Sequence, residues 1–231
     1  MVATSKKSRK EEYISDANLQ AKSRNWLSDI RYYSYGIDDW KYVPTSSALI
    51  VMDMQKFFLS EESHAFIPAS KAIIPNVRDL IASFRNRDLP VIFTRHSLKK
   101  NEEPGIMGRW WADVIREDSE LSNITNLLTP LDSEIVIRKT RYSAFFGTEL
   151  EKVLKREKVE NIVVTGVMTH LCCETTAREA FMKDFEVFFV VDATATQNEE
   201  LHLSTLRTLS DGFAVPVTTK EILKEIEEGK T

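Results

Sequence analysis

The chain has 231 residues, of which 42% are hydrophobic and 29% charged, the ordinary balance of a folded globular protein. A formal net charge of −4 excludes a general nucleic-acid binder, which needs a strongly basic surface. No apolar run approaches the roughly 20 residues that cross a bilayer, and the charged first residues lack the apolar core of a signal peptide. We therefore expect a protein whose partner is a small-molecule substrate, with no nucleic acid and no membrane.

The two cysteines of the chain, Cys172 and Cys173, are adjacent. Adjacent cysteines cannot cross-link distant segments, and here they lack the partners of a zinc site. This usage is typical of a reducing compartment, so we expect a cytoplasmic location.

The first 43 residues differ in character from the rest of the chain. Residues 1–12 are basic and polar, which indicates a solvated tail. Residues 13–43 carry many aromatic side chains: Tyr13, Trp26, Tyr32, Tyr33, Tyr35, Trp40 and Tyr42. We interpret this stretch as an amphipathic helix and an irregular arm that lie on the domain or on a second subunit. The prediction is an extension over residues 1–43, one domain over residues 44–231, and a homo-oligomer, either dimer or tetramer.

From residue 47 onward, short apolar runs alternate with stretches of helical spacing. The predicted strands cover residues 48–52, 90–94, 134–137, 161–165, 185–191 and 212–216. The predicted helices lie at residues 70–87, near 148–156, after the cysteine pair, near 198–209, and at 219–228, and residues 95–130 form a long excursion. Near-continuous apolar strands that alternate with helices predict an α/β fold, a parallel sheet covered on both faces.

Reactive side chains follow several of these strands. Asp53 comes after the first strand, Lys139 after the third, and Cys172 after the fourth. Ligands of parallel sheets bind beyond the carboxyl ends of the strands, so these side chains are expected at one edge. A carboxylate can move protons, an ammonium can hold a thiolate, and a thiolate can attack a carbonyl. Each residue alone has a structural explanation, but the combination favours a catalytic triad.

The cysteine pair lies where the fourth strand turns into a helix. Cys173 shares one helical stripe with Ala177 and Ala180, which predicts a core position. Cys172 is rotated about 100° from it, towards the mouth of the turn. The positive end of a helix dipole lowers the pKa of a thiol, so Cys172 is the candidate nucleophile.

Residues 53–55, 139–145 and 166–180 together resemble the isochorismatase-like (cysteine hydrolase) family, and the resemblance covers about residues 40–216. It implies a three-layer, doubly wound fold with six mainly parallel strands and helices on both faces. It also implies that Asp53, Lys139 and Cys172 form the triad.

Two further features follow from the resemblance. It implies a cis peptide before Met168 and an oxyanion hole made by the backbone N–H groups of Met168 and Cys172. The implied activity is hydrolysis of a C–N bond in a small amide or carbamoyl substrate, with no cofactor and no metal.

Two alternatives stay open. The family's isochorismate hydrolases carry glycine at the position of Cys172, because they cleave a vinyl ether by protonation from the aspartate. They also carry an arginine at the position of Pro104 and a tyrosine at that of Met168. An isochorismate-type vinyl ether hydrolase is therefore one alternative, and a non-catalytic binding protein is the other.

Some residues near the site have simpler explanations. A metal-dependent nicotinamidase is disfavoured, because His96 stands alone where such enzymes carry an Asp-x-His motif. His96 and His170 are interpreted as structural histidines, and Arg178 as an ion-pair partner.

The excursion supplies candidates for the wall of a substrate pocket. We expect Phe58, Trp110, Trp111 and Tyr142 to form an aromatic cavity for a small ring or branched amide. The alternative for the tryptophans is that one packs in the core and the other in a dimer interface. Gln55 is a candidate for orienting Asp53 or Lys139.

Overall fold

The computed structural model describes residues 10–31 and 40–229. The predictions for residues 1–9 and for Tyr32, Tyr33 and Tyr35 fall outside the described residues. Within those two ranges, none of the helices is both long and apolar enough to cross a membrane.

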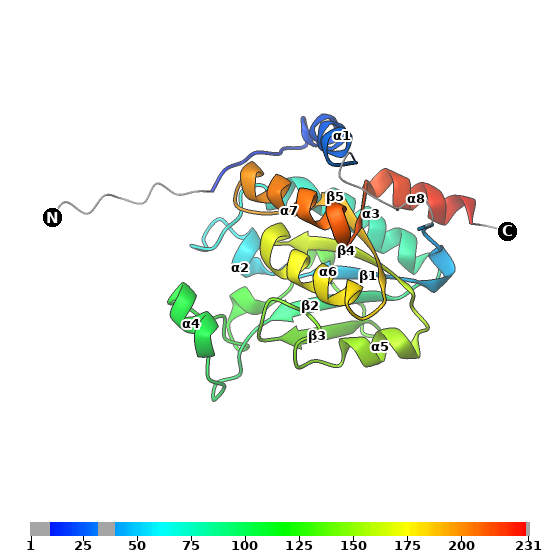
Figure 1. Cartoon of the computed structure of the whole chain (residues 1–231). Helices are drawn as coiled ribbons and strands as arrows, with labels where there is room; N and C mark the ends of the chain where they lie inside the picture. The colour runs from blue at the N-terminus through cyan, green and yellow to red at the C-terminus, as the bar shows by residue number, and fades with distance from the viewer. Residues whose placement is uncertain (1–9, 32–39, 230–231) are drawn as a thin grey trace.

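One sheet of six parallel strands, in the order β3-β2-β1-β4-β5-β6, forms the centre of the protein (Figure 1). The strands are β1 (Ser47–Met52), β2 (Val91–His96), β3 (Ile135–Lys139), β4 (Asn161–Val167), β5 (Glu186–Ala195) and β6 (Val215–Val217). Every strand pairing is parallel, so the six-stranded α/β prediction is confirmed. β5 continues past the predicted end at residue 191, because its small and polar last residues still pair with β4 up to Ala195.

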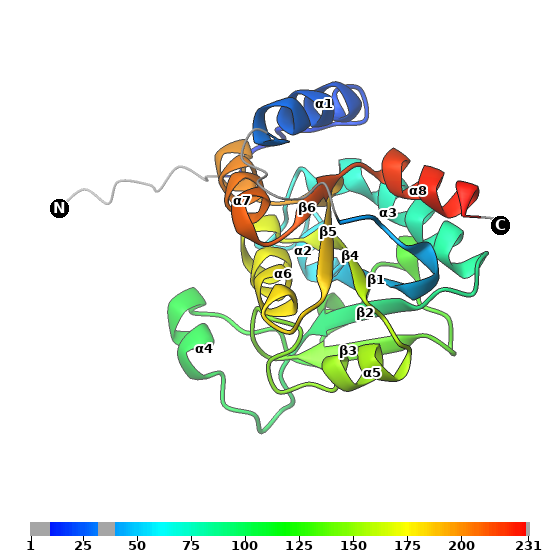
Figure 2. The same ribbon diagram turned by 45° about the vertical axis from the view of Figure 1, so that its right-hand side comes forward.

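Helices cover both faces of the sheet (Figure 2). α3 (Ser70–Arg85) and α8 (Thr219–Glu228) pack together on one face, and α6 (Glu174–Phe181) and α7 (Glu199–Gly212) on the other. The remaining pieces are α2 (Lys56–Leu59), α4 (Gly105–Trp111), α5 (Leu150–Arg156), a π-helical turn (Thr169–Cys173) and the 3-10 turns Pro44–Ser46, Glu120–Ser122 and Asn126–Leu128. The chain fills one half of the sheet with β1 to β3 and then returns beside β1 with β4, which makes the fold doubly wound.

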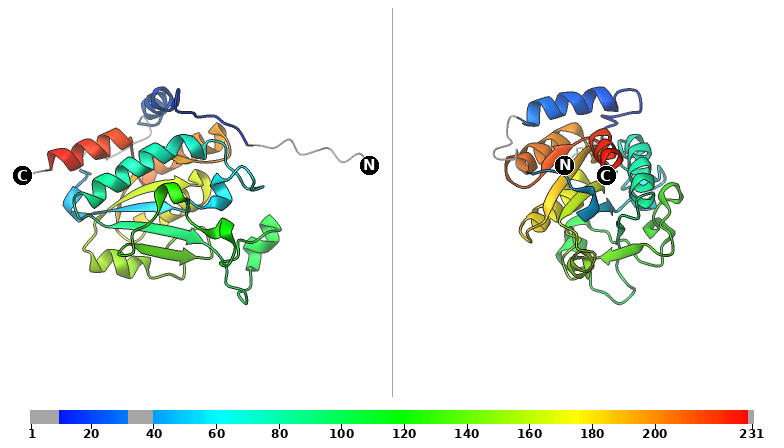
Figure 3. Two further views of the ribbon diagram at one scale, coloured as in Figure 1. Left: turned by 180° about the vertical axis from the view of Figure 1, so that it is seen from behind. Right: turned by 90° about the vertical axis from the view of Figure 1, so that its right-hand side faces the viewer.

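The N-terminal helix α1 (Leu19–Ile30) lies across the β5–β6 end of the molecule (Figure 3). It contacts β5, β6 and α7, and its buried residues Trp26, Leu27 and Ile30 belong to the same hydrophobic core as the sheet. This part of the aromatic extension therefore lies on the domain of its own chain.

Candidate active site

Asp53 follows β1 at the centre of the sheet edge and is fully buried. Its backbone is left-handed, with φ of 45°, and turns the chain out of the strand. Thr94 on the neighbouring β2 donates from Oγ1 to Asp53 Oδ1 at 2.6 Å and accepts from the Asp53 backbone N–H at 3.0 Å. Two adjacent strands thus hold the carboxylate in one orientation.

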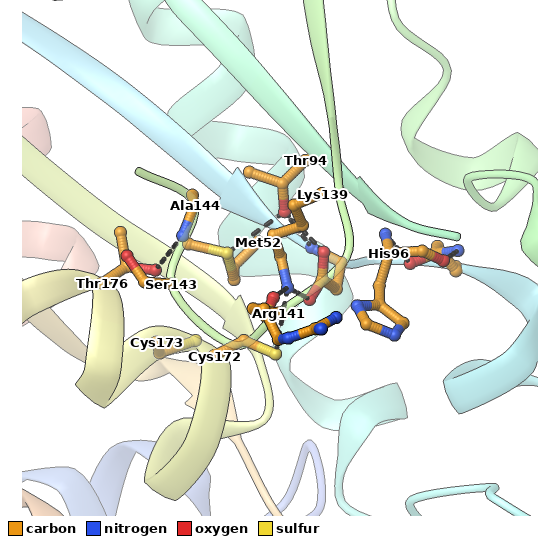
Figure 4. A network of polar contacts seen from close by, with 12 residues as sticks. Met52, Thr94, His96, Lys139, Arg141, Ser143, Ala144, Cys172, Cys173 and Thr176 are labelled. Carbon is orange, nitrogen blue, oxygen red and sulfur yellow. Dashed lines mark hydrogen bonds and ion pairs between the residues drawn. The ribbon is translucent and has the colours of Figure 1, made fainter. Parts of the chain in front are cut away.

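Lys139, the last residue of β3, joins the other two members of the predicted triad. Its Nζ lies 2.7 Å from Asp53 Oδ2 and 3.2 Å from Cys172 Sγ, and it also donates to the Arg141 carbonyl at 3.1 Å (Figure 4). Burial alone would lower the pKa of Lys139, but the Asp53 carboxylate and the Cys172 sulfur more than reverse this and raise it. The ammonium therefore stays charged across the working pH range.

Cys172 faces a cavity from the π-helical turn between β4 and α6. Burial raises the pKa of its thiol to about 12. The Lys139 ammonium acts to lower this pKa, but the Asp53 carboxylate opposes that effect. The prediction of a lowered pKa for this thiol is therefore wrong. Exclusion of water outweighs the helix dipole, and the positive charge beside the sulfur is already paired.

The backbone around Cys172 depends on a close approach of β1 and β4. Gly166 has φ of 103°, and a Cβ there would fall 2.1 Å from the Met52 carbonyl oxygen, so only glycine fits. The following Val167–Met168 peptide is cis, as the resemblance implies. The Met168 carbonyl accepts from Leu171 N at 3.1 Å and Cys173 N at 3.2 Å, which sets the turn that presents Cys172.

A cavity of about 230 Å³ opens above Cys172. It is lined by Lys10, Phe57, Phe58, His64, Ala65, His96, Leu98, Met107, Trp111, Asp113, Val114, Ile115, Thr140, Tyr142, Met168, Leu171, Cys172 and Gln197. Phe58, Trp111 and Tyr142 thus form part of the wall, and Trp111 Nε1 donates to the Tyr142 hydroxyl at 2.8 Å. Trp110 does not line the cavity, contrary to the prediction. It is 75% exposed, because it lies on the outer side of the short helix α4.

His96 lines the cavity, and it also has the hydrogen bond that we expected of a structural histidine, to the Arg141 backbone. Its Nδ1 is buried and has no hydrogen-bond partner among the described residues. Burial and the nearby Lys139 charge lower its pKa to about 4, so the ring is neutral at pH 7. The sequence held a signal for this position, because His96 ends β2 just as Lys139 ends β3.

Gln55 does not orient Asp53 or Lys139 through its side chain. It donates from Nε2 to the carbonyls of His96 at 3.0 Å and Ser122 at 2.7 Å, and accepts from His96 N at 2.8 Å. Gln55 therefore ties the end of β2 to the excursion and supports the position of His96.

The remaining candidates near the site have structural partners, as predicted. His170 Nδ1 lies 2.5 Å from Thr196 Oγ1, and Arg178 pairs with Glu174 at 2.8 Å. Cys173 is fully buried in the core.

The side chains at the sheet edge do not fit a protein-held metal. Across residues 10–31 and 40–229, no group of three or more His, Cys, Asp or Glu side chains is placed to hold an ion. An Asp-x-His motif ending at His96 would need an aspartate two residues earlier, where this chain has Thr94, so the carboxylate of that motif is missing.

Comparisons with known proteins place this chain in a family. Residues 47–221 match the model of the isochorismatase domain. The chain is 43% identical to nicotinamidase 3 of Arabidopsis thaliana over 78% of its own length and 88% of that protein. It is 31% identical to enterobactin synthase component B of Escherichia coli, over 80% of this chain and 65% of that protein. A cysteine hydrolase from Pseudomonas syringae superposes with a TM-score of 0.79 at 25% identity, covering 82% of this chain and 96% of that one.

Proposed function

Since the chain belongs to the isochorismatase family, we propose that it is a cysteine hydrolase that cleaves a C–N bond in a small amide or carbamoyl compound. The observation that carries this proposal is the position of Lys139, whose Nζ lies within 3.2 Å of both the Asp53 carboxylate and the Cys172 sulfur. A buried acid, cation and thiol in contact beneath a cavity are the parts that covalent catalysis at a carbonyl requires.

In the first half of the reaction, a substrate carbonyl binds above Cys172. The thiol proton passes to Asp53 as Sγ attacks the carbonyl carbon, and Lys139 stabilises the forming thiolate. This order fits the raised pKa of the resting thiol, because the proton leaves only when the substrate is in place. The backbone N–H groups of Met168 and Cys172 would hold the oxyanion.

In the second half, the tetrahedral intermediate collapses and the C–N bond breaks. Asp53 returns its proton to the leaving nitrogen, which departs as ammonia or an amine. Asp53 then takes a proton from water as the water attacks the thioester carbonyl. Collapse of the second tetrahedral intermediate breaks the C–S bond, and the leaving Sγ takes that proton from Asp53. The products are the carboxylic acid, or carbamic acid from a carbamoyl compound, and the restored Cys172 thiol.

The cavity favours a small substrate. Its volume of about 230 Å³ lies below the roughly 300 Å³ at which drug-sized pockets begin, and most of its wall is made of apolar and aromatic side chains. The name of the Arabidopsis relative, a nicotinamidase, supports a small carboxamide as the substrate class.

The test is ammonia release from a panel of small amides and carbamoyl compounds, including nicotinamide. We expect turnover by the wild type, no turnover by Cys172→Ala, and turnover by Cys173→Ala. If the wild type cleaves isochorismate and Cys172→Ala keeps that activity, the vinyl ether alternative is correct. If neither class of substrate is turned over and the thiol does not react with iodoacetamide, the protein is a non-catalytic binder.

We also propose a homo-oligomer and a cytoplasmic location. Ile106 and Trp110 on α4 are 59% and 75% exposed, which supports an apolar contact with a second copy. Light scattering would contradict this proposal if it showed a monomer. The two buried thiols are unpaired, which suits a reducing compartment.

A further inference from the structure

The N-terminal segment before α1 packs against the loop that follows β5. Glu11 N donates to the Gln197 carbonyl at 2.7 Å, and Ile14 is fully buried. The family match covers residues 47–221, so this segment lies outside it. It nevertheless reaches the neighbourhood of the cavity, since Gln197 is one of the lining residues.

The π-helical turn that carries Cys172 is held through two of its side chains. Thr169 Oγ1 lies 3.0 Å from His202 Nδ1 on α7. His170 Nδ1 lies 2.5 Å from Thr196 Oγ1, just after β5. The first contact is buried and the second partly buried, so water competes weakly with either. The orientation of the turn therefore depends on where His202 and Thr196 lie.

Tyr13 contacts both of the residues that hold the turn. Its hydroxyl accepts from Thr196 N at 3.1 Å, and its ring centroid lies 5.6 Å from that of His202. Trp26 on α1 packs against the same histidine, with 4.7 Å between the ring centroids. Because Tyr13 is only 6% exposed, close packing restricts both its ring and its hydroxyl. One side chain from outside the family match thus joins the two supports of the turn.

The Tyr13 hydroxyl is linked to the turn through a single intervening residue. It binds the backbone N–H of Thr196, whose own hydroxyl contacts His170. Cys172 follows His170 by two residues, and its Sγ lies 3.2 Å from Lys139 Nζ. A misplacement of about 1 Å in a reacting group can lower a rate about 10²-fold, so a small shift of the turn matters to the chemistry.

We propose that Tyr13 is a positioning residue for the turn that carries Cys172. It acts through Thr196 and His170, not by contact with the substrate. The effect on the reaction rests on the proposed function, whereas the position of the turn is measurable without turnover.

The kinetic test removes the hydroxyl and keeps the ring. Tyr13→Phe should lower kcat about three- to tenfold and leave KM unchanged, because the turn shifts while the cavity wall stays in place. Tyr42→Phe is the matched control, since the Tyr42 hydroxyl lies 2.9 Å from Ser47 Oγ at the start of β1, at the other edge of the sheet from Cys172. Both variants should lose a similar amount of stability in urea unfolding, but only Tyr13→Phe should lose rate. A raised KM with an unchanged kcat would contradict the positioning role.

A double variant tests the path through Thr196. Thr196→Val removes the hydroxyl that contacts His170 but keeps the backbone N–H that binds Tyr13. Tyr13→Phe should therefore lower kcat less in the Thr196→Val protein than in wild type. Thr196→Ser keeps the hydroxyl and should keep the rate. Losses that simply add in the double variant would overturn this path.

Alkylation separates this inference from the proposed function. In a Cys173→Ala background, the gain of mass after exposure to iodoacetamide reports Cys172 alone. Tyr13→Phe should slow this reaction about threefold or more, because Sγ loses its alignment with the Lys139 ammonium. That result supports the inference even if no amide is hydrolysed. An unchanged alkylation rate, or an equal change in Tyr42→Phe, would overturn it, and Tyr13 would then only fasten the segment to the loop after β5.

Discussion

The two ends of the cavity are built in opposite ways. At the base, Asp53 and Lys139 have 0% and 1% of their surface exposed, and neighbouring strands hold them. At the mouth, none of the seven described residues of α4 is buried, and the helix projects from the body of the protein (Figure 1). The base is fixed by hydrogen-bonded strands, whereas the mouth is made of a loop excursion and the N-terminal segment.

Under the proposed function, this difference separates the residues of the reaction from those that select the substrate. Side chains at the base depend on the register of a buried sheet, so a change there disturbs both the reaction and the fold. Side chains at the mouth touch few neighbours, so a change there alters only what binds. Substitutions at the base should therefore change both activity and stability by large amounts, whereas substitutions at the mouth should change substrate binding by smaller amounts.

The largest effect is expected at the centre of the base. Lys139→Met should lower kcat/KM at least about 10³-fold, because the thiolate and the Asp53 charge lose their cation. It should also cost about 3–5 kcal/mol of stability in urea unfolding, since one partner of a buried ion pair is removed.

Two further variants sharpen this prediction. In Asp53→Asn/Lys139→Met no buried charge is left unpaired, so stability should recover while activity does not. Lys152→Met changes a lysine side chain that is 80% exposed and should alter neither property. Normal activity in Lys139→Met would contradict the assigned role of the lysine.

A smaller loss is expected at the strand beside the base. Thr94→Val removes the hydroxyl that donates to Asp53 Oδ1 at 2.6 Å. A hydrogen bond to a charged group is worth about 1.5–3 kcal/mol, so kcat should fall roughly 10- to 100-fold if the carboxylate turns. Thr94→Ser keeps the hydroxyl and should restore most of the rate, which a purely steric role of the side chain would not predict.

The stability of the protein should depend on pH through a histidine that contacts the π-helical turn Thr169–Cys173. His202 Nδ1 lies 3.0 Å from Thr169 Oγ1, and burial lowers the pKa of His202 to about 3. An unfolded histidine has a pKa of about 6.5, so between these values only the unfolded chain binds the proton. Stability should therefore fall as the pH falls below 6.5, by up to about 1.4 kcal/mol per unit for this group.

Urea unfolding between pH 7.5 and pH 5 measures this slope. His202→Gln should reduce the change of unfolding free energy with pH by the amount that one bound proton contributes. His96, whose pKa burial also lowers, should still contribute to the slope in this variant. A slope that is equal in wild type and His202→Gln would show that this histidine is not the acid-sensitive group.

The sequence predicted the base well because topology alone brings strand ends together. Asp53, Lys139 and Cys172 each follow an apolar run, and a parallel sheet has one carboxyl edge. The charge state of the thiol could not be predicted in the same way. It depends on burial and on the Lys139–Asp53 pair, which no local pattern reports.

The mouth was harder to predict for a related reason. Trp110 and Trp111 are neighbours of the same type, and only the three-dimensional path of α4 decides which one faces the cavity. Lys10 belongs to a stretch that is basic and polar throughout, so its sequence resembles a solvated tail. Its place at the cavity follows from the burial of Tyr13 and Ile14 further along the chain.

The smallest effect is expected at the tryptophans of α4, and it tests the comparison most directly. Trp111→Phe keeps an aromatic ring on the cavity wall but removes the bond to the Tyr142 hydroxyl. A net hydrogen bond contributes about 0.5–1.5 kcal/mol, so KM should rise roughly two- to tenfold while kcat stays unchanged. Trp110→Phe alters a side chain outside the cavity and should change neither constant. If steady-state kinetics instead showed a lower kcat in Trp111→Phe, the mouth would take part in the chemistry, and its separation from the base would fail.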